Sequence, residues 1–216
     1  MTNQEVPKVK TPISEAELSR SFIDVAKDLF KIDLNKQQLS ILIAQNNLET
    51  GSRASMYNFN IGNITHKSTV DSFDYFMGGD KTRGKDGKWV PTKYQFRAYE
   101  NLNEGVKDYL KNLKFRGKGN VWNAVMSADP TQFSKALKDT RYYEADEADY
   151  TKGMIAGVNA FNKRKSYEDA IAGNFTVTTN SASDKSIKPD FLSEIGKLVD
   201  NFLSAIAKSE NNNFIK

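Results

Sequence analysis

The 216-residue chain contains no cysteine and only one histidine, His66. The absence of cysteine excludes disulfides, thiol nucleophiles and thiolate metal sites. A single histidine excludes a metal site built from several imidazoles. All apolar runs are shorter than the ~20 residues of a membrane span, so no transmembrane segment is predicted. The N-terminus also lacks the apolar segment of a secretory signal, so we expect action outside a cytoplasm to need another route.

Charge of one sign is only slightly in excess, with a formal net charge of +4. Such a balance suits polyanionic partners, including nucleic acid and bacterial envelope polymers, but it is also common on solvated surfaces. The sequence shows no basic stripe with interleaved aromatic residues, so we predict no nucleic-acid partner. The length allows one domain of ordinary size with some residues to spare.

Helical periodicity predicts an α-rich domain over residues 14–162. Three helix starts are marked by a polar cap and a polar residue three positions later: Ser14 with Glu17, Asn35 with Gln38, and Asn101 with Glu104. Each pair precedes apolar residues at helical spacing. Asp129 followed by Pro130 marks a fourth start. Shorter apolar patterns predict helices over about 121–126 and 150–161.

Between these helices, residues from about 65 to 99 are rich in glycine, aspartate and aromatic side chains. We interpret this segment as a small, irregular β-lobe. Lys85-Asp86-Gly87-Lys88 predicts a hairpin turn. Residues 89–90 and 94–96 are expected as short strands beside it.

The two ends of the chain differ from the domain in composition. We expect a disordered arm at 1–13, a linker at 163–188, an amphipathic helix at 189–208 and a tail at 209–216. The C-terminal helix could fold back on the domain or dock elsewhere. Its mixed charge favours a protein partner over a lipid surface.

Glu49 stands at the end of an apolar helix, with Gln45 four residues earlier on the same face. The negative end of the helix dipole and partial burial both disfavour ionisation, so the pKa of Glu49 is expected to rise. A carboxylic acid that stays protonated near neutral pH can donate a proton to the leaving oxygen of a glycoside. The competing interpretation is a solvated glutamate at a helix end.

The segment from Ala44 to Gly51, AQNNLETG, resembles the catalytic helix of the lysozyme superfamily. It is similar to soluble lytic transglycosylases and to glucosaminidases of glycoside hydrolase family 73, which share an Ala-Gln-x-x-x-Glu-[Ser/Thr]-Gly signature. Residues 57–64, 96–113 and 141–154 resemble later motifs of these families in the same order. The resemblance covers about 39–162 and implies a mainly α, lysozyme-like α+β fold with a cleft beside the β-lobe.

The resemblance also implies roles for individual residues. Glu49 corresponds to the general acid, and Tyr143 to a tyrosine near it. The residues expected to contact sugar are Gln45, Tyr57, Asn58, Asn63 and Asp146. Tyr142 departs from the pattern, because the family motif has glycine there.

A second departure concerns the β-lobe, where glucosaminidases are often assigned a second carboxylate on a glutamate. This chain has no glutamate between Glu49 and Glu100. Asp74 is our candidate for that role, with Asp80 as the alternative. If neither serves, a lytic transglycosylase or a substrate-assisted hydrolase still needs only one protein acid.

Cleavage of the β-1,4 bond between GlcNAc and MurNAc in peptidoglycan is the activity that the resemblance implies, without cofactor or metal. Together with the missing signal and cysteines, it suggests a bacteriophage virion component that acts on the host cell wall. The C-terminal helix would then attach it to a tail or internal virion protein. An endolysin, a bacterial autolysin with another export route, and a catalytically inactive lysozyme-like structural protein are the alternatives.

Overall fold

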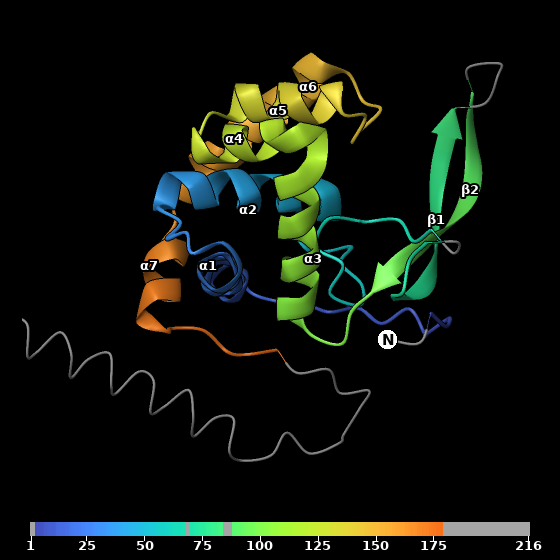
Figure 1. The fold of residues 1–216 in the computed structure, drawn as a ribbon, viewed down its shortest axis with the longest axis horizontal. Coiled ribbons are helices and arrows are strands. Elements are labelled where there is room, and N and C mark those ends of the chain that lie inside the picture. The colour runs from blue at the N-terminus through green and yellow to red at the C-terminus, as the bar shows by residue number, and fades with distance from the viewer. Residues whose placement is uncertain (1–2, 68–69, 84–87, 179–216) are drawn as a thin grey trace, which may run out of the picture. The chain divides into compact units, whose positions relative to one another are not determined.

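A computed structural model describes residues 3–67, 70–83 and 88–178 (Figure 1). The C-terminal helix, the tail and the hairpin turn expected from the sequence lie outside the described residues. The elements are α1 (Glu15–Phe30), α2 (Lys36–Thr50), β1 (Asp74–Arg83), β2 (Trp89–Ala98), α3 (Leu102–Phe115), a 3-10 turn (Arg116–Gly119), α4 (Asn120–Met126), α5 (Pro130–Asp139), α6 (Glu147–Asn162) and α7 (Ser166–Ala172).

Helix α2 runs through the middle of the helical part, with α5 and α6 on one side and α1 and α7 on the other (Figure 1). Its middle is enclosed on all sides, because all six residues from Leu39 to Ala44 are buried, Ser40 among them. Helix α6 lies close against it because Gly157 has no side chain. A Cβ at Gly157 would lie 2.9 Å from the Cβ of Ala44. The helix that carries Glu49 is therefore fixed by packing along its length.

The predicted helix starts are confirmed. The Ser14 side chain accepts a hydrogen bond from the Glu17 amide, and Asn101 does the same for Glu104. Asn35 and Gln38 form the reciprocal pair. Each such cap contributes about 1 kcal/mol. Asp129 caps α5 with Pro130 at its first turn.

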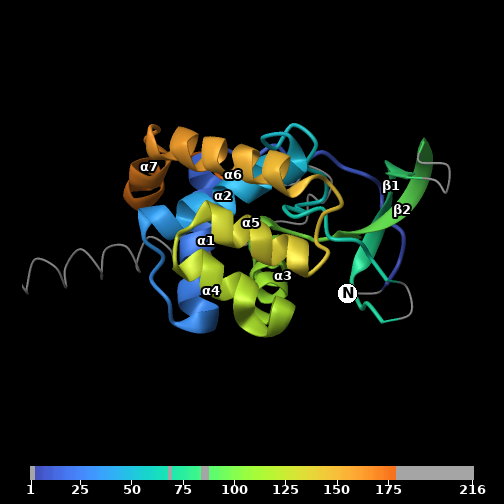
Figure 2. The same cartoon turned by 90° about the horizontal axis from the view of Figure 1, so that it is seen from above.

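The β-lobe is a two-stranded antiparallel hairpin in which Asp74 pairs with Ala98 and Arg83 with Trp89. The sequence predicts two short strands over 89–96, whereas the structure forms one continuous β2. Aromatic packing between the strands favours the longer pairing, since Phe76 stacks on Phe96 with ring centroids 5.6 Å apart. Figure 2 shows the hairpin projecting to one side of the helices.

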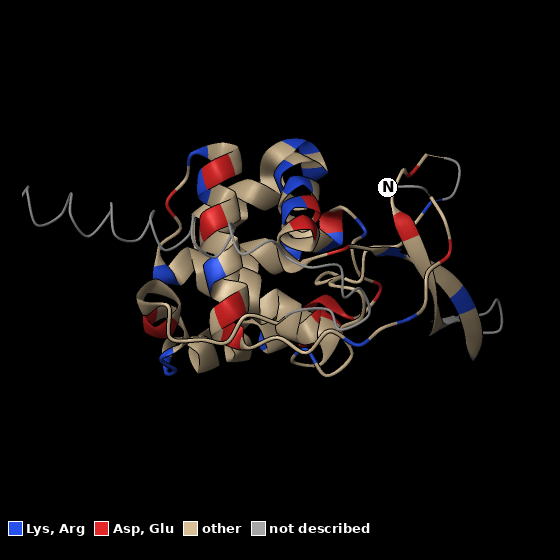
Figure 3. Cartoon of the chain, turned by 90° about the horizontal axis from the view of Figure 1, so that it is seen from below, with Lys and Arg blue, Asp and Glu red and all other residues tan. Residues whose placement is uncertain are grey.

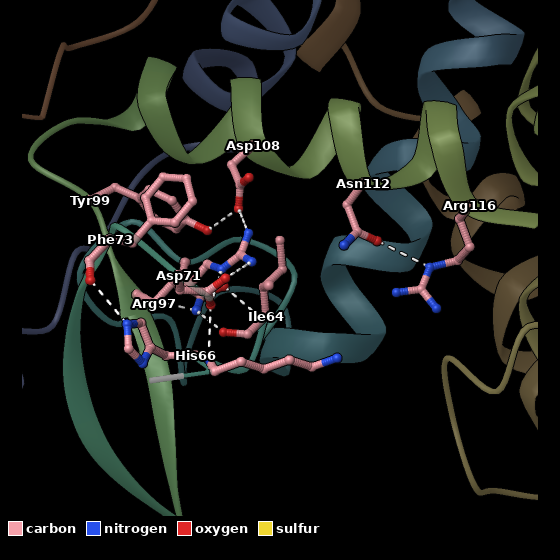
Figure 4. Close-up of polar contacts among 11 residues, drawn as sticks. Ile64, His66, Asp71, Phe73, Arg97, Tyr99, Asp108, Asn112 and Arg116 are labelled. Carbon is pink, nitrogen blue, oxygen red and sulfur yellow. Dashed lines mark hydrogen bonds and ion pairs between the residues drawn. The ribbon is translucent and has the colours of Figure 1, made fainter. Parts of the chain in front are cut away.

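An ion-pair cluster fastens the base of the hairpin to α3 (Figure 4). Arg97 on β2 donates to both carboxylate oxygens of Asp71, at 2.9 and 2.6 Å, and to Asp108 of α3 at 2.7 Å. The Tyr99 hydroxyl donates to the same Asp108 oxygen at 2.6 Å. All three charged side chains are largely buried, with exposed fractions of 17% or less. Buried ion pairs thus hold the β-lobe to the helical part.

The N-terminal arm differs from the disordered segment expected at 1–13. Over residues 3–13 the chain follows the domain surface, and Val6 donates its amide hydrogen to Tyr75 on β1. Asn58 holds the arm with its side chain, because its Oδ1 accepts from Val9 and its Nδ2 donates to Pro7. Hydrogen bonds to residues 49 to 70 positions away give no local sequence signal.

The range expected as a linker also contains structure, because residues 166–172 form α7. This helix packs against α1, with Ala170 fully buried. Beside it, Arg164 and Ser166 both bond to the buried carboxylate of Glu15, at 2.5 and 2.8 Å. Thr178 donates to Glu17. The domain therefore extends past residue 162 in the structure. Polar contacts hold this part of the chain, which has no apolar periodicity in its sequence.

Candidate active site

Glu49 lies in the last turn of α2, where Gly51 ends the helix in a left-handed conformation with φ of 56°. The side chain is half-buried, whereas Gln45, Asn46 and Thr50 around it are fully buried. Within the described residues, no ion pair involves Glu49. The carboxyl group therefore has no cation to stabilise its charge.

Tyr150 of α6 supplies the side-chain contact to the acid. Its hydroxyl donates to Oε1 of Glu49 at 3.0 Å. The ring of Tyr143 stacks face to face on the ring of Tyr150, with centroids 3.7 Å apart and planes 5° apart. The Tyr143 hydroxyl itself lies 3.1 Å from Ser134 on α5. Tyr150 thus makes the contact with the acid that the resemblance implies for Tyr143, and Tyr143 supports its ring.

One turn before the acid, Gln45 forms a buried polar link between α2 and α3. Its Oε1 accepts a hydrogen bond from the Tyr109 hydroxyl, and neither side chain is exposed. The amide nitrogen of Gln45 has no hydrogen-bond partner. Burial raises the pKa of the Tyr142 and Tyr150 hydroxyl groups, and the nearby Gln45 side chain offsets a small part of that rise. These contacts place the amide next to the tyrosines that surround Glu49.

The loop after α2 returns to the acid at Gly62 and Asn63. Asn63 donates from Nδ2 to the backbone oxygen of Glu49, and the Tyr142 hydroxyl donates to the carbonyl of Gly62 at 2.9 Å. Gly62 is required here for space. A Cβ on it would lie 2.6 Å from the Tyr109 ring and 3.1 Å from the Tyr142 hydroxyl. The Gly-Asn pair therefore lets two tyrosines approach the end of α2.

The surroundings of Glu49 favour its protonated form and move its titration toward neutral pH. Burial raises the pKa of Glu49 from its usual value of 4.5 to about 7, and the hydrogen bond from Tyr150 lowers it in part. The same burial, together with the nearby Glu49 charge, raises the pKa of Tyr150 and Tyr142. The tyrosines therefore remain neutral donors, and Glu49 is the group that can exchange a proton at neutral pH.

Not every residue predicted for the site lies beside Glu49. Asn63 and Gln45 do, through the contacts above. Asn58 is buried and its amide is committed to the N-terminal arm. Tyr57 packs near Phe76 with Lys8 Nζ 4.0 Å from its ring centroid.

Asp74 and Asp146 occupy structural positions. Asp74 begins β1 and accepts a hydrogen bond from the Gln4 amide at 3.1 Å. Asp146 is the N-cap of α6 and accepts from the amides of Ala148 and Asp149. Helix α6 consequently begins at Glu147, three residues before the expected start. The cap fixes the helix that carries Tyr150, so Asp146 supports the acid from a distance.

Three tyrosines near the acid, Tyr109, Tyr142 and Tyr150, are absent from the residues predicted for the site. They come from α3, from the loop before α6 and from α6 itself. Tyr150 falls inside the closing motif recognised in the sequence, which could have identified it. Nothing local marks Tyr109, because its helical position is that of a core residue.

Within residues 3–67, 70–83 and 88–178, no three acidic or histidine side chains gather closely enough to hold a metal ion. In the same part of the chain, no helix has the length and apolar character needed to cross a bilayer.

Solved structures share this fold at low sequence identity. A peptidoglycan hydrolase mutant from Sphingomonas sp. A1 is 17% identical, with a TM-score of 0.53, over 74% of this chain and 99% of that one. The catalytic domain of the autolysin Auto from Listeria monocytogenes is 15% identical, with a TM-score of 0.51, over 71% of this chain and 84% of that one. These likenesses establish the lysozyme-like fold.

The sequence itself identifies the family. No curated protein matches the chain. The glucosaminidase family, described as mannosyl-glycoprotein endo-beta-N-acetylglucosaminidase, matches residues 31–183, which is more than half of the chain. That range contains Glu49, the β-lobe and the three tyrosines. A lysozyme-like fold and a half-buried carboxyl group of raised pKa thus accompany the family match, and the chain belongs to the glucosaminidase family of glycosidases.

Proposed function

We propose that the protein cleaves the β-1,4 bond between GlcNAc and MurNAc in peptidoglycan, with Glu49 as general acid. The observation that carries this proposal is the half-buried Glu49 carboxyl group, whose pKa is about 7 and which accepts a hydrogen bond from the Tyr150 hydroxyl. The likeness to a peptidoglycan hydrolase and an autolysin supports the choice of glycan.

Glu49 acts in two steps. Its proton passes to the glycosidic oxygen while the bond from that oxygen to the anomeric carbon breaks, and positive charge develops on the sugar ring. The carboxylate that remains accepts a stronger hydrogen bond from Tyr150, because the acceptor is now charged. It then takes a proton from the incoming nucleophile, which is water in a hydrolase and the 6-hydroxyl of the substrate in a transglycosylase. Glu49 is thereby restored to its acid form.

A second carboxylate would assist by stabilising the charged ring. We retain Asp74 for this role as a prediction, since it lies at the base of the hairpin. Asp71 is a poorer choice, because Arg97 holds both of its oxygens. If Asp74→Asn cleaves as fast as the wild type, the assignment is wrong and a one-acid mechanism remains.

The decisive experiment compares Glu49→Gln with wild type and Glu144→Gln on purified peptidoglycan. Glu144 is exposed, so its amide controls for the loss of one negative charge. We expect Glu49→Gln to lose roughly 10²- to 10⁴-fold in rate, the usual contribution of general acid catalysis. If Glu49→Gln cleaves at the wild-type rate, Glu49 is not the general acid. No cleavage by any variant at several pH values would favour the inactive lysozyme-like protein.

Mass spectrometry of the released fragments identifies the bond and the mechanism. Anhydro ends indicate a transglycosylase, and reducing ends indicate a hydrolase. The sugar found at the new end shows which of the two alternating bonds is cut.

We propose separately that the protein is a component of a phage virion and meets the host wall from outside. The support is the sequence pattern alone, a polar tether followed by the amphipathic segment 189–208, and both lie largely outside the described residues. Immunoblotting of purified particles tests it. Detection in the soluble lysate but not in particles would contradict the location and leave the cleavage chemistry untouched.

A further inference from the structure

Helix α3 carries basic side chains along the face that lies opposite the core. Lys107, Lys111 and Lys114 follow one another at spacings of three and four residues, so they share one side of the helix. Phe115 lies beside them at the end of α3, and Lys118 follows in the 3-10 turn. In Figure 3, blue bands of Lys and Arg follow one another along α3, with red bands among them. We call this set of five residues the α3 basic face.

The positive charge of this face is not neutralised within the described part of the chain. None of its four lysines forms an ion pair there. The ammonium group of Lys114 lies over aromatic rings of the protein, 5.4 Å from the ring centroid of Phe30 and 5.2 Å from that of Trp122. The two acidic residues of α3 are occupied elsewhere. Asp108 binds Arg97 and Tyr99, and Glu104 accepts from the amide of Glu100.

Phe115 is the apolar member of the α3 basic face, and 73% of it is exposed. A single exposed aromatic ring among lysines offers apolar surface that a bound polymer can contact. It is too little apolar area for an interfacial helix, which buries a broad apolar face in lipid. In α3 that broad apolar face, including Val106 and Leu110, is already in the protein core.

The spacing of the lysines also discriminates between polyanions. With a rise of 1.5 Å per residue, successive ammonium groups on α3 are roughly 4.5–6 Å apart along the helix axis. Duplex DNA presents one charge about every 1.7 Å of its axis, which is much denser. A single chain with one charge per repeating unit matches the face better.

We propose that the α3 basic face binds a linear phosphodiester-linked polymer. The source we assign, a polyol phosphate chain attached to the cell wall, rests on the proposed function. Tyr109 on the buried side of α3 contacts Gln45 of the active-site helix, whereas the basic face lies on the other side of α3. The polymer is therefore held on the side of α3 that faces away from the active-site helix, and it keeps the enzyme on the wall without occupying the place of the glycan.

The binding should depend on salt in a defined way. Each phosphate contact to a single-stranded polyanion contributes roughly −0.7 to the slope of log affinity against log salt. Three to four lysine contacts give a slope of about −2 to −3. Raising salt from about 50 to 200 mM should then weaken binding roughly 20- to 50-fold.

The test uses the full chain carrying Glu49→Gln, so that binding is measured without cleavage. The triple variant Lys107→Gln, Lys111→Gln, Lys118→Gln is compared with the control triple Lys27→Gln, Lys163→Gln, Lys165→Gln, which removes the same charge from exposed lysines elsewhere. Fluorescence titration with poly(glycerol phosphate) measures the affinity. We expect the α3 triple to bind at least roughly tenfold more weakly with a salt slope smaller by about 2, and the control to change little.

The source of the polymer is tested by sedimentation with cell walls. Intact walls should retain the Glu49→Gln protein, and walls stripped of phosphodiesters by hydrofluoric acid should retain much less of it. Equal retention would refute the source. Unchanged affinity in the α3 triple, an equal loss in the control triple, or tighter binding to duplex DNA or anionic vesicles than to poly(glycerol phosphate) would each overturn the proposal.

Cleavage provides an independent readout. With Glu49 restored, the α3 triple should cut isolated glycan strands at the wild-type rate and intact walls more slowly. A variant that is slow on isolated strands as well would show that α3 acts on the chemistry, which contradicts a docking role. Because binding is measured with Glu49→Gln, a failure of the proposed glycan chemistry leaves the binding result separate.

Discussion

The pKa values of two partly buried carboxyl groups in this molecule are shifted in opposite directions. Asp71, at the base of the β-lobe, loses solvation, but hydrogen bonds and charge from Arg97 outweigh this loss and its pKa is lowered. Glu49, at the end of α2, also loses solvation, and one tyrosine hydroxyl offsets only part of the effect, so its pKa rises to about 7. Both carboxyl groups lose solvation, and the donors around Asp71, which are the Arg97 guanidinium and the Lys67 amide, account for the opposite direction of its pKa shift.

The two regions divide the work of the domain. A paired carboxylate tolerates burial and holds the lobe to α3, because each oxygen has a donor. An unpaired one resists ionisation, which costs stability above its pKa but provides a proton at neutral pH. The active-site end of α2 is thus a place where folding stability is lower than the same sequence could achieve with an amide.

Removing the guanidinium should have the largest effect on stability. Arg97→Met leaves Asp71 and Asp108 buried without a cation, and we expect a loss of roughly 3–5 kcal/mol in the free energy of unfolding. Urea denaturation followed by circular dichroism measures it. The control is Arg20→Met, which breaks an exposed pair with Asp24 and should cost less than about 1 kcal/mol. Equal effects of the two variants would contradict the assigned importance of the Arg97 cluster.

Glu49→Gln should stabilise the fold at alkaline pH. The folded pKa of about 7 exceeds the usual 4.5, so the folded state binds more protons between these values and the wild type loses stability as pH rises through this window. Gln accepts the Tyr150 hydrogen bond without a charge. At pH 8 the variant should be more stable by roughly 2–3 kcal/mol, and at pH 4 the two should be similar. A difference that does not change with pH would rule out the raised pKa.

Tyr150→Phe should have the smallest effect of the three, a shift in the pH profile of activity. The Tyr150 hydroxyl lowers the pKa of Glu49, so its removal raises that pKa. The alkaline limb of kcat/KM should then move upward by about one pH unit. Tyr143→Phe is the matched control, because its ring stacks on Tyr150 while its hydroxyl contacts Ser134. A limb that moves in the control but not in Tyr150→Phe would reverse the assignment of the two tyrosines.

The sequence predicts well those features that local chemistry determines. The caps at Ser14, Asn35, Asn101 and Asp129 depend on residues within three positions, and all are found in the structure. The lysozyme-like fold was also accessible, because its motifs keep their order along the chain. Glu49 can be predicted because the end of an apolar helix, an acidic side chain and the family signature all lie within the eight residues from Ala44 to Gly51.

Features made by distant partners were missed. Asn58 looks like a sugar-binding amide in the sequence, but its partners are Pro7 and Val9. Tyr150 contacts Glu49 across 101 residues, so the motif resemblance of residues 141–154 includes Tyr150 but local spacing does not reveal the contact. Helix α7 is seven residues long, too short for apolar periodicity to reveal it.

The contacts between the start of α1 and residues 164–178 have a consequence for how the chain folds during synthesis. Glu15 at the start of α1 pairs with Arg53, 38 residues later, and Glu15 and Glu17 find their other partners at Arg164, Ser166 and Thr178, about 150 to 160 residues later in synthesis. Contacts of such long range form slowly and late. The two carboxylates at the start of α1 therefore stay in contact with water until the last helices of the domain have been made and can cover them.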